Sequence, residues 1–549
     1  MSVTLPPVRA RLADGDDGAS ASSQPVTPDL EAWLDGVLHR HPTVGLAVAM
    51  IRRGRQPQFA VRGLASIASR RPVTEDTVFR IGSVTKLVTA IAVMQLAERG
   101  ELDLDAPANE VLRAFRLAPA EPGLRSPTIR HLLTHTAGIS EVVRLGDLLH
   151  PDWGPFMARP AIASAALGAA LPSLASYYRG ELRYVVEPGT IFAYSNHGFA
   201  TLGQLVEDVT GQPLDRTYRE RIFEPLGMAD TDLSRSERVR AALATGYEFG
   251  SRGPAAVTDR EWLGPAGGGI YSSTRDLARL AAALLGGGTA GGDTGGAAGD
   301  GRILEPASLA TMFAPSFQPV PQLPGVGLGC FGGEVAGHRI VQHDGLLPGF
   351  AGQLVVAPDD DVAIVGLTNG SPNAHAWLPI ELAALLRELI GAPVEDEEPP
   401  GRFPQHPEAW PELCGRYVMP ARIADLRGRL ALSGVEVGVR GGRLTARLRT
   451  PIPWLSRTFE LEPDDAGDPD VVRIDLTSFG LPMTRVVFAR DADGRVSAAH
   501  ADLLLQVFEK RPGRSGPGPW LAGALGAIAV ATAVRAVRRR VRAQRGASP

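Results

Sequence analysis

The sequence predicts an α+β protein, in which an antiparallel sheet is flanked by helices and interrupted by an all-helical insertion, followed by a small β-rich domain. Three observations support this prediction. Strand and helix patterns occur at both ends of residues 28–395, the stretch between them is mostly helical, and short alternating runs follow residue 405. The 549 residues, 44% of them hydrophobic, suffice for one large core and a second, smaller one.

Composition divides the chain into four segments. Residues 1–27 are polar and rich in Ser, Asp and Pro, which predicts a disordered leader, and we see no apolar core of an export signal in them. Residues 28–395 form the main domain, and a run of acidic residues and prolines at 395–404 marks its end. Residues 405–512 form the β-rich domain, and 513–549 contain a linker, a short apolar segment and a basic tail.

The main domain begins and ends with the same kinds of element. Apolar runs bounded by turn residues predict strands, and the spacing of apolar residues predicts helices. The expected elements are a helix at 30–38, strands at 44–51 and 58–63, a hairpin of 353–356 with 362–367, and a helix at 377–389. The Gly- and Ala-rich stretch 286–301 is expected to be a flexible surface insertion, because it lacks the Gly-Lys-Ser/Thr ending of a phosphate loop.

The residue pattern changes in the C-terminal part of the chain. Alternating runs at 443–448, 471–476 and 485–488, separated by turn signals such as Gly441-Gly442, predict a β sandwich or barrel. Later, fifteen uncharged residues at 520–534 precede a group of arginines. A spanning helix needs about twenty apolar residues, so membrane association through 520–545 and a solvated or docked helix both stay open.

Composition also excludes several kinds of partner. The formal charge of −4 argues against a surface that binds nucleic acid. The two cysteines, Cys330 and Cys414, form no disulfide framework or metal-ligand spacing, and the eleven histidines show no metal-binding pattern. We therefore expect neither a metal nor another cofactor. The location stays open between the cytoplasm and a membrane surface.

Lysine is almost absent from this chain. Of the 56 basic residues, only Lys86 and Lys510 are lysines. Arginine cannot lose its proton in a protein, whereas a desolvated lysine can. The retained amine at position 86 is therefore a candidate base, with chance as the alternative explanation.

Ser83 and Lys86 lie at the start of a predicted helix. The sequence from Ile81 to Lys86 leads into apolar residues 87–96 and a candidate C-cap at Gly100. Exposed amides and the helix dipole favour negative charge at Ser83, and residues three apart share one helix face. Ser83 is thus a candidate nucleophile with Lys86 as its base, although a serine alone at this position is usually an N-cap.

Two further polar motifs occur later in the chain. Tyr194 and Asn196 follow a turn, and their phenol and amide could shuttle a proton, hold a substrate carbonyl or orient the lysine. His343-Asp344-Gly345 precedes a strand hairpin, and its glycine would let a ligand approach the backbone. Each motif alone is usually an ordinary loop or turn.

Together, these three motifs in this order resemble the class C β-lactamase and penicillin-recognising serine hydrolase family, which includes esterases, D-aminopeptidases and DD-peptidases. Residues 79–86, 131–138 and 265–280 resemble that family as well. The resemblance spans about residues 40–390 and implies a β-lactamase/transpeptidase-like fold. In their position along the chain and their alternating residue pattern, residues 405–512 resemble the lipocalin-like barrel that some members carry.

The resemblance implies a role for each motif residue. Ser83 would be acylated, and Lys86 and Tyr194 would share the acid and base work. His131 and His135 match a stretch that is structural in the family. Asn196 would hydrogen-bond both the substrate and Lys86. The other implied roles are substrate binding by His343 and Gly345, and an oxyanion hole formed by the backbone amides of Ser83 and Leu346.

One departure from the family affects the expected substrate. Penicillin-binding relatives usually carry Lys-Thr-Gly where this chain has His343-Asp344-Gly345, and a histidine is mostly neutral near pH 7. This weakens a true β-lactamase assignment. The leading hypothesis is a serine hydrolase that cleaves a small-molecule or peptide ester or amide through an acyl-enzyme on Ser83. An acyltransferase, transpeptidase or peptide-cyclising thioesterase, and a non-catalytic module that binds cell-wall peptide, are the alternatives.

Overall fold

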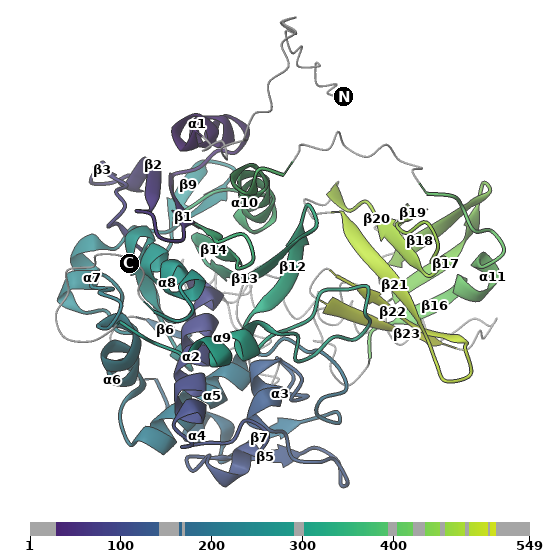
Figure 1. Cartoon of the computed structure of the whole chain (residues 1–549), viewed down its shortest axis with the longest axis horizontal. Helices are drawn as coiled ribbons and strands as arrows, with labels where there is room; N and C mark the ends of the chain where they lie inside the picture. Colours follow the sequence, from purple (N-terminus) through teal and green to yellow (C-terminus); the bar gives the residue numbers. More distant parts are fainter. Residues whose placement is uncertain are drawn as a thin grey trace, which may run out of the picture.

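The computed structural model describes residues 29–141, 164–166, 171–289, 301–392, 403–420, 434–450, 456–477, 483–502 and 505–511 (Figure 1). The predicted leader at 1–27 and the apolar segment at 520–545 lie outside these residues. So do residues 290–300 of the glycine-rich stretch and 395–402 of the predicted boundary.

A seven-stranded antiparallel sheet forms the centre of the main domain. Its strand order is β12-β13-β14-β15-β1-β2-β3, so strands from the two ends of the domain pair in the middle, with Leu46 opposite Thr368. This confirms the predicted sheet. Its strands are β1 (Gly45–Arg52), β2 (Gln58–Ser66), β3 (Arg71–Pro72), β12 (Phe331–Val335), β13 (His338–Leu347), β14 (Phe350–Ala357) and β15 (Val362–Thr368).

Helices cover both faces of this sheet (Figure 1). On one face, α1 (Leu30–Arg40) and α10 (Ala374–Ile390) pack against alternate β1 residues such as Val48. On the other face, α8 (Thr274–Leu285) and α2 (Thr85–Glu98) share a core with the intervening residues of β1. Burial on both faces explains why this strand reads as a continuous apolar run.

The insertion between the first and last strands of the sheet is mainly helical, and it also contains short two-stranded sheets that the sequence did not predict. Segments of three or four residues are too short to show a periodicity. The helices are α3 (Ile129–Leu133), α4 (Leu174–Tyr178), α5 (Asn196–Thr210), α6 (Leu214–Tyr218), α7 (Glu237–Ala242) and α9 (Pro306–Phe313). The short sheets pair β5 (Arg116–Pro119) with β7 (Glu181–Tyr184), β6 (Ser164–Ala166) with β10 (Arg260–Trp262), β8 (Tyr247–Gly250) with β9 (Gly253–Ala256), and β4 (Val78–Arg80) with β11 (Tyr271–Ser273).

Helix α2 runs through the core of the main domain. Every residue from Thr85 to Leu96 is buried, as expected for a helix that is apolar on nearly every face. The helix ends at Glu98, and Gly100 has a φ of +68°, which fits its predicted place at the end of the helix. Deep burial holds the start of this helix, and with it the Ser83 turn, in one position.

The C-terminal region is a closed eight-stranded barrel, so the predicted β-rich barrel is confirmed. Each strand pairs with the next, and the last pairs with the first, which leaves no free strand edge. A short helix, α11 (Trp410–Leu413), precedes it. The strands are β16 (Gly415–Val418), β17 (Gly434–Arg440), β18 (Arg443–Arg449), β19 (Arg457–Pro463), β20 (Val471–Ile474), β21 (Thr484–Arg490), β22 (Val496–Ala501) and β23 (Gln506–Arg511).

The barrel packs against the main domain near β12 (Figure 1). Val320 and Leu323 of the main domain form an apolar cluster with Val471 and Val487 of the barrel. Within the described part of the chain, no helix combines the length and apolar character that crossing a membrane requires.

Candidate active site

Ser83 lies in a short 3-10 turn, η1 (Gly82–Val84), immediately before α2. The backbone of β13 crosses this turn so closely that a Cβ at Gly82 would lie 2.7 Å from the Leu346 nitrogen. Gly82 also has a φ of +54°, a conformation that favours glycine. Ser83 is partly exposed, whereas Gly82 and Val84 on either side of it are buried.

Lys86 is fully buried one helical turn after Ser83. Its Nζ donates to Ser83 Oγ at 2.9 Å, to Asn196 Oδ1 at 2.8 Å and to the Gly267 carbonyl at 2.5 Å. Burial lowers the pKa of the Lys86 ammonium to about 7, against opposing effects of the Glu141 and Asp344 carboxylates. A lysine with this pKa can exchange a proton near neutral pH.

Tyr194 approaches the same serine from the loop before α5. Its hydroxyl donates to Ser83 Oγ at 2.7 Å, and its ring centroid lies 4.8 Å from Lys86 Nζ. Burial raises the pKa of the Tyr194 phenol well above its ordinary value, and the hydrogen bond to Ser83 opposes this shift. The phenol is therefore neutral at pH 7 and carries a proton that it can donate.

Asn196 is the first residue of α5, which Ser195 caps. The Asn196 side-chain oxygen accepts from Lys86, and its Nδ2 donates to Glu141 Oε1 at 2.7 Å. Its backbone amide donates to Glu141 Oε2 at 2.8 Å. Of the two roles predicted for the Asn196 side chain, the contacts favour orienting the lysine.

Strand β13 forms the opposite wall. A Cβ at Gly345 would lie 1.9 Å from the Ile81 carbonyl and 3.1 Å from the Ser83 nitrogen, so only glycine permits this approach. The same approach brings Leu346, the residue after Gly345, beside the Ser83 turn.

His343 lies two residues before Gly345, on the same face of β13. Its side chain is 1% exposed, its ring lies 5.1 Å from that of Phe331, and its Nε2 has no hydrogen-bond partner in the described residues. Burial lowers the pKa of the His343 imidazole to about 4. The ring is therefore neutral at pH 7 and supplies no fixed positive charge.

Three contributors were not predicted as part of the site. Glu141 and the Gly267 carbonyl contact Asn196 and Lys86, respectively, from segments far away in sequence. The third, His135, was assigned a structural role, and its ring stacks on Tyr194. No local sequence signal marks Glu141, because its partner lies 55 residues away.

The barrel reaches the edge of this site. Leu505, between β22 and β23, forms an apolar cluster with Phe192 and Val326, and the ring of Tyr194 packs against this cluster. Phe317 and Phe331 complete the group. An apolar wall built from both domains therefore lies beside the candidate acid.

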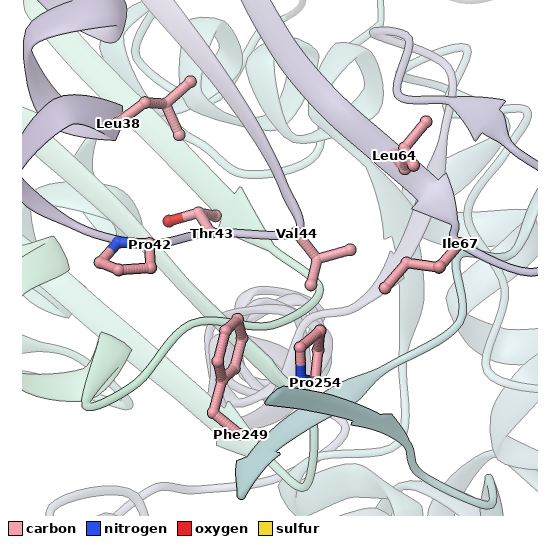
Figure 2. A pocket seen from close by; sticks show the side chains of 8 residues that line it. All are labelled: Leu38, Pro42, Thr43, Val44, Leu64, Ile67, Phe249 and Pro254. Atoms are coloured by element: carbon pink, nitrogen blue, oxygen red, sulfur yellow. The ribbon is translucent and has the colours of Figure 1, made fainter. Parts of the chain in front are cut away.

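A separate hollow lies elsewhere in the main domain. Figure 2 shows eight side chains that line about 590 Å³ between the end of α1, β2 and the β8–β9 hairpin. The lining is apolar apart from Thr43, whose hydroxyl donates to a backbone carbonyl. The hollow includes none of the predicted site residues, so it offers no nucleophile, acid or base for acyl transfer.

Comparison with known proteins places the chain in a family. The beta-lactamase family model matches residues 30–386. Penicillin-binding protein 4 of Amycolatopsis lactamdurans is 32% identical over 397 residues, which cover 70% of this chain and 95% of that protein. Esterase EstB of Burkholderia gladioli is 36% identical over 244 residues, covering 42% of this chain and 57% of the esterase.

Solved structures extend the likeness beyond the main domain. The crystal structure of SurE matches with a TM-score of 0.59 at 24% identity, covering 88% of this chain and 98% of SurE. At that identity the match concerns the fold alone, and its coverage includes part of the barrel. The chain therefore belongs to the beta-lactamase family, and it is a serine hydrolase of that family.

Proposed function

We propose that this protein cleaves ester or amide bonds through an acyl-enzyme formed on Ser83. The observation that carries the proposal is the convergence of two proton-carrying groups on one oxygen. Lys86 Nζ and Tyr194 Oη lie 2.9 Å and 2.7 Å from Ser83 Oγ. A buried amine and a neutral phenol at these distances are the base and the acid that acyl transfer needs.

Acylation would begin from neutral Lys86. The amine takes the proton of the Ser83 hydroxyl while Oγ attacks the substrate carbonyl carbon. The bond to the leaving alcohol or amine then breaks, and Tyr194 donates a proton to that group and recovers one from Lys86. In the second half, water attacks the acyl carbon and gives one proton to Lys86. The bond from Ser83 Oγ to the acyl carbon then breaks, Lys86 passes that proton to Ser83 Oγ, and the acid product leaves with the other proton of the water.

Two backbone amides would hold the negative oxygen of the tetrahedral intermediate. The Ser83 amide lies at the start of α2, where unpaired N–H groups and the helix dipole favour negative charge. The Leu346 amide lies beside the same turn, as the close approach of β13 to Gly82 indicates. These amides would form the oxyanion hole.

The surroundings of the site favour uncharged, apolar substrates. Neutral His343 offers no fixed cation for a substrate carboxylate, and the cluster around Leu505 provides an apolar wall beside Tyr194. We therefore propose esters or amides of apolar acids as the substrate class. The similarity to an esterase supports an ester as the scissile group.

The test uses the full-length chain and a fluorophosphonate probe, with intact-protein mass spectrometry as the readout. We expect one adduct on the wild type, none on Ser83→Ala and strongly slowed labelling of Lys86→Ala. Turnover of p-nitrophenyl esters of increasing chain length then measures the preference for apolar acids. Adding an alcohol or amine acceptor distinguishes hydrolysis from acyl transfer by the products formed.

The exposed Ser497, in the barrel, provides a matched serine control, and Ser497→Ala should label like the wild type. A wild type that neither labels nor turns over any ester would contradict the proposal and favour a binding module. Equal labelling of Ser83→Ala would place the nucleophile elsewhere.

A further inference from the structure

Glu141 contacts the active site without touching the nucleophile. Its two carboxylate oxygens accept hydrogen bonds from the Asn196 amide nitrogen and side-chain nitrogen, at 2.8 Å and 2.7 Å. Its backbone carbonyl lies 3.2 Å from His197 Nε2. The carboxylate is thus aligned with the first turn of α5, where unpaired N–H groups favour negative charge.

This arrangement determines which way the Asn196 amide faces. The two ends of an amide side chain have the same shape, so only its hydrogen bonds select an orientation. Glu141 accepts from Nδ2, and this leaves Oδ1 towards Lys86, where it accepts at 2.8 Å. Without an acceptor at Glu141, the Asn196 side chain could rotate so that its Nδ2 faces Lys86 Nζ. Two hydrogen-bond donors would then face each other.

Glu141 also contributes charge to a buried site. Several charged or titratable groups in the described residues contact Lys86 or act on it electrostatically. They are Glu141, His135 after α3, Tyr194 before α5, the buried His343 of β13, and the exposed Asp344 on the opposite face of that strand. Of these groups, both histidines are neutral at pH 7, because burial lowers the pKa of each imidazole. Among the described residues, Glu141 and Asp344 are therefore the carboxylates that favour the Lys86 ammonium.

We propose that Glu141 is a positioning residue, which locks the Asn196 oxygen towards Lys86 and supplies the negative charge that balances the protonated amine between proton transfers. The proposal rests on the proposed function of Ser83 and Lys86. It assigns Glu141 two separable effects, one from its contacts and one from its charge. Both effects matter for a base that works near neutral pH, because Lys86 must alternate between the neutral amine and the protonated ammonium during turnover.

The experiment measures the rate of fluorophosphonate labelling of the full-length protein from pH 5 to pH 9. Glu141→Gln removes the charge and places an amide donor against the donors of Asn196. We expect its plateau rate to fall about ten- to a hundredfold, as for the loss of a charge-assisted hydrogen bond. The acid limb of its profile of labelling rate against pH should move about one pH unit lower, because the Lys86 ammonium loses a neighbouring negative charge that stabilises it.

A second variant separates contact from charge. Glu141→Asp keeps the carboxylate but shortens the side chain, so it cannot reach both Asn196 donors. We expect a reduced plateau with the acid limb at the wild-type pH. Glu381→Gln is the matched control, since Glu381 pairs with Arg40 and His41 on the far face of the sheet. It should alter stability without changing the plateau or the limb.

Each outcome bears on the proposal. If Glu141→Gln has the same plateau rate and the same acid limb as the wild type, the proposal for Glu141 is overturned. If the wild-type protein does not label at all, the proposed function of Ser83 is overturned instead. If Glu141→Gln does not fold, Glu141→Asp decides, and a wild-type plateau in that variant would overturn the positioning role. A lowered plateau with an unmoved limb in Glu141→Gln would overturn the charge-balancing role.

Discussion

His135 and Tyr194 lie ring against ring, with centroids 4.4 Å apart and 28° between their planes. His135 Nδ1 also accepts from the Ser195 amide at 3.1 Å, so one imidazole holds both the ring of Tyr194 and the backbone that follows it. Burial keeps the pKa of the imidazole well below its ordinary value, so the ring stays neutral and able to accept. The structural role expected for this histidine thus includes orienting the candidate acid.

We predict that His135→Asn lowers the rate of ester turnover by about tenfold or more, because loss of the stack releases Tyr194 from its position. Asparagine tolerates the φ of +57° at this position better than most residues. His131→Asn is the matched control, because His131 takes part in the cap of α3. Steady-state kinetics at saturating ester checks the prediction, and equal turnover by both variants would refute it.

The rate should depend on pH through Lys86. Because burial lowers the pKa of this ammonium to about 7, the reactive amine predominates above that pH and disappears below it. We therefore expect kcat/KM for a neutral ester to decrease towards acid pH, with the midpoint of this decrease near pH 7. A limb near the ordinary lysine value of 10.5 would show that Lys86 is not desolvated in solution.

Replacing Lys86 by arginine should abolish the base while keeping the charge. Arginine does not lose its proton, so we expect turnover to fall by about 10²- to 10⁴-fold. Lys510→Arg is the natural control, since the other lysine lies on β23 of the barrel. Comparable rates for the two variants, measured on equally folded protein, would exclude Lys86 as the base.

Gly345→Ala should damage the site more than the fold. The new Cβ would lie 1.9 Å from the Ile81 carbonyl, so β13 must move away from the Ser83 turn. This movement would separate the backbone amides of Ser83 and Leu346, which we propose as the oxyanion hole. We expect about a hundredfold loss of kcat, comparable to removing one oxyanion donor. A Cβ at Gly438 meets nothing within 4 Å, so Gly438→Ala should keep wild-type rates.

Leu505→Ala should change the substrate preference. Truncation opens space beside Phe192 and Tyr194, where a longer acyl chain could be accommodated. We expect the ratio of kcat/KM for long over short p-nitrophenyl esters to rise relative to the wild type. Val439→Ala, at an exposed barrel position, should leave the ratio unchanged, and an unchanged ratio in Leu505→Ala would separate the barrel from substrate selection.

Local patterns predicted much of the fold. The expected helix at 30–38 and strand at 44–51 agree with α1 and β1 to within two residues. The expected runs at 443–448 and 485–488 lie within β18 and β21. Strong periodicity and turn residues act over a few positions, so they can be read from the sequence. The short β5–β7 and β6–β10 pairs carry no such periodicity and depend on tertiary contact.

The sequence by itself determined the pairing of Ser83 with Lys86, because residues three apart on one helix must share a face. It also indicated the all-round burial of α2, which gives Lys86 its low pKa. Tertiary structure alone decided that Glu141 accepts from Asn196, that Gly267 accepts from Lys86, and that Leu505 joins the apolar cluster beside Tyr194. These contacts join residues from separate segments, and their geometry depends on how the main domain and the barrel pack rather than on any local pattern.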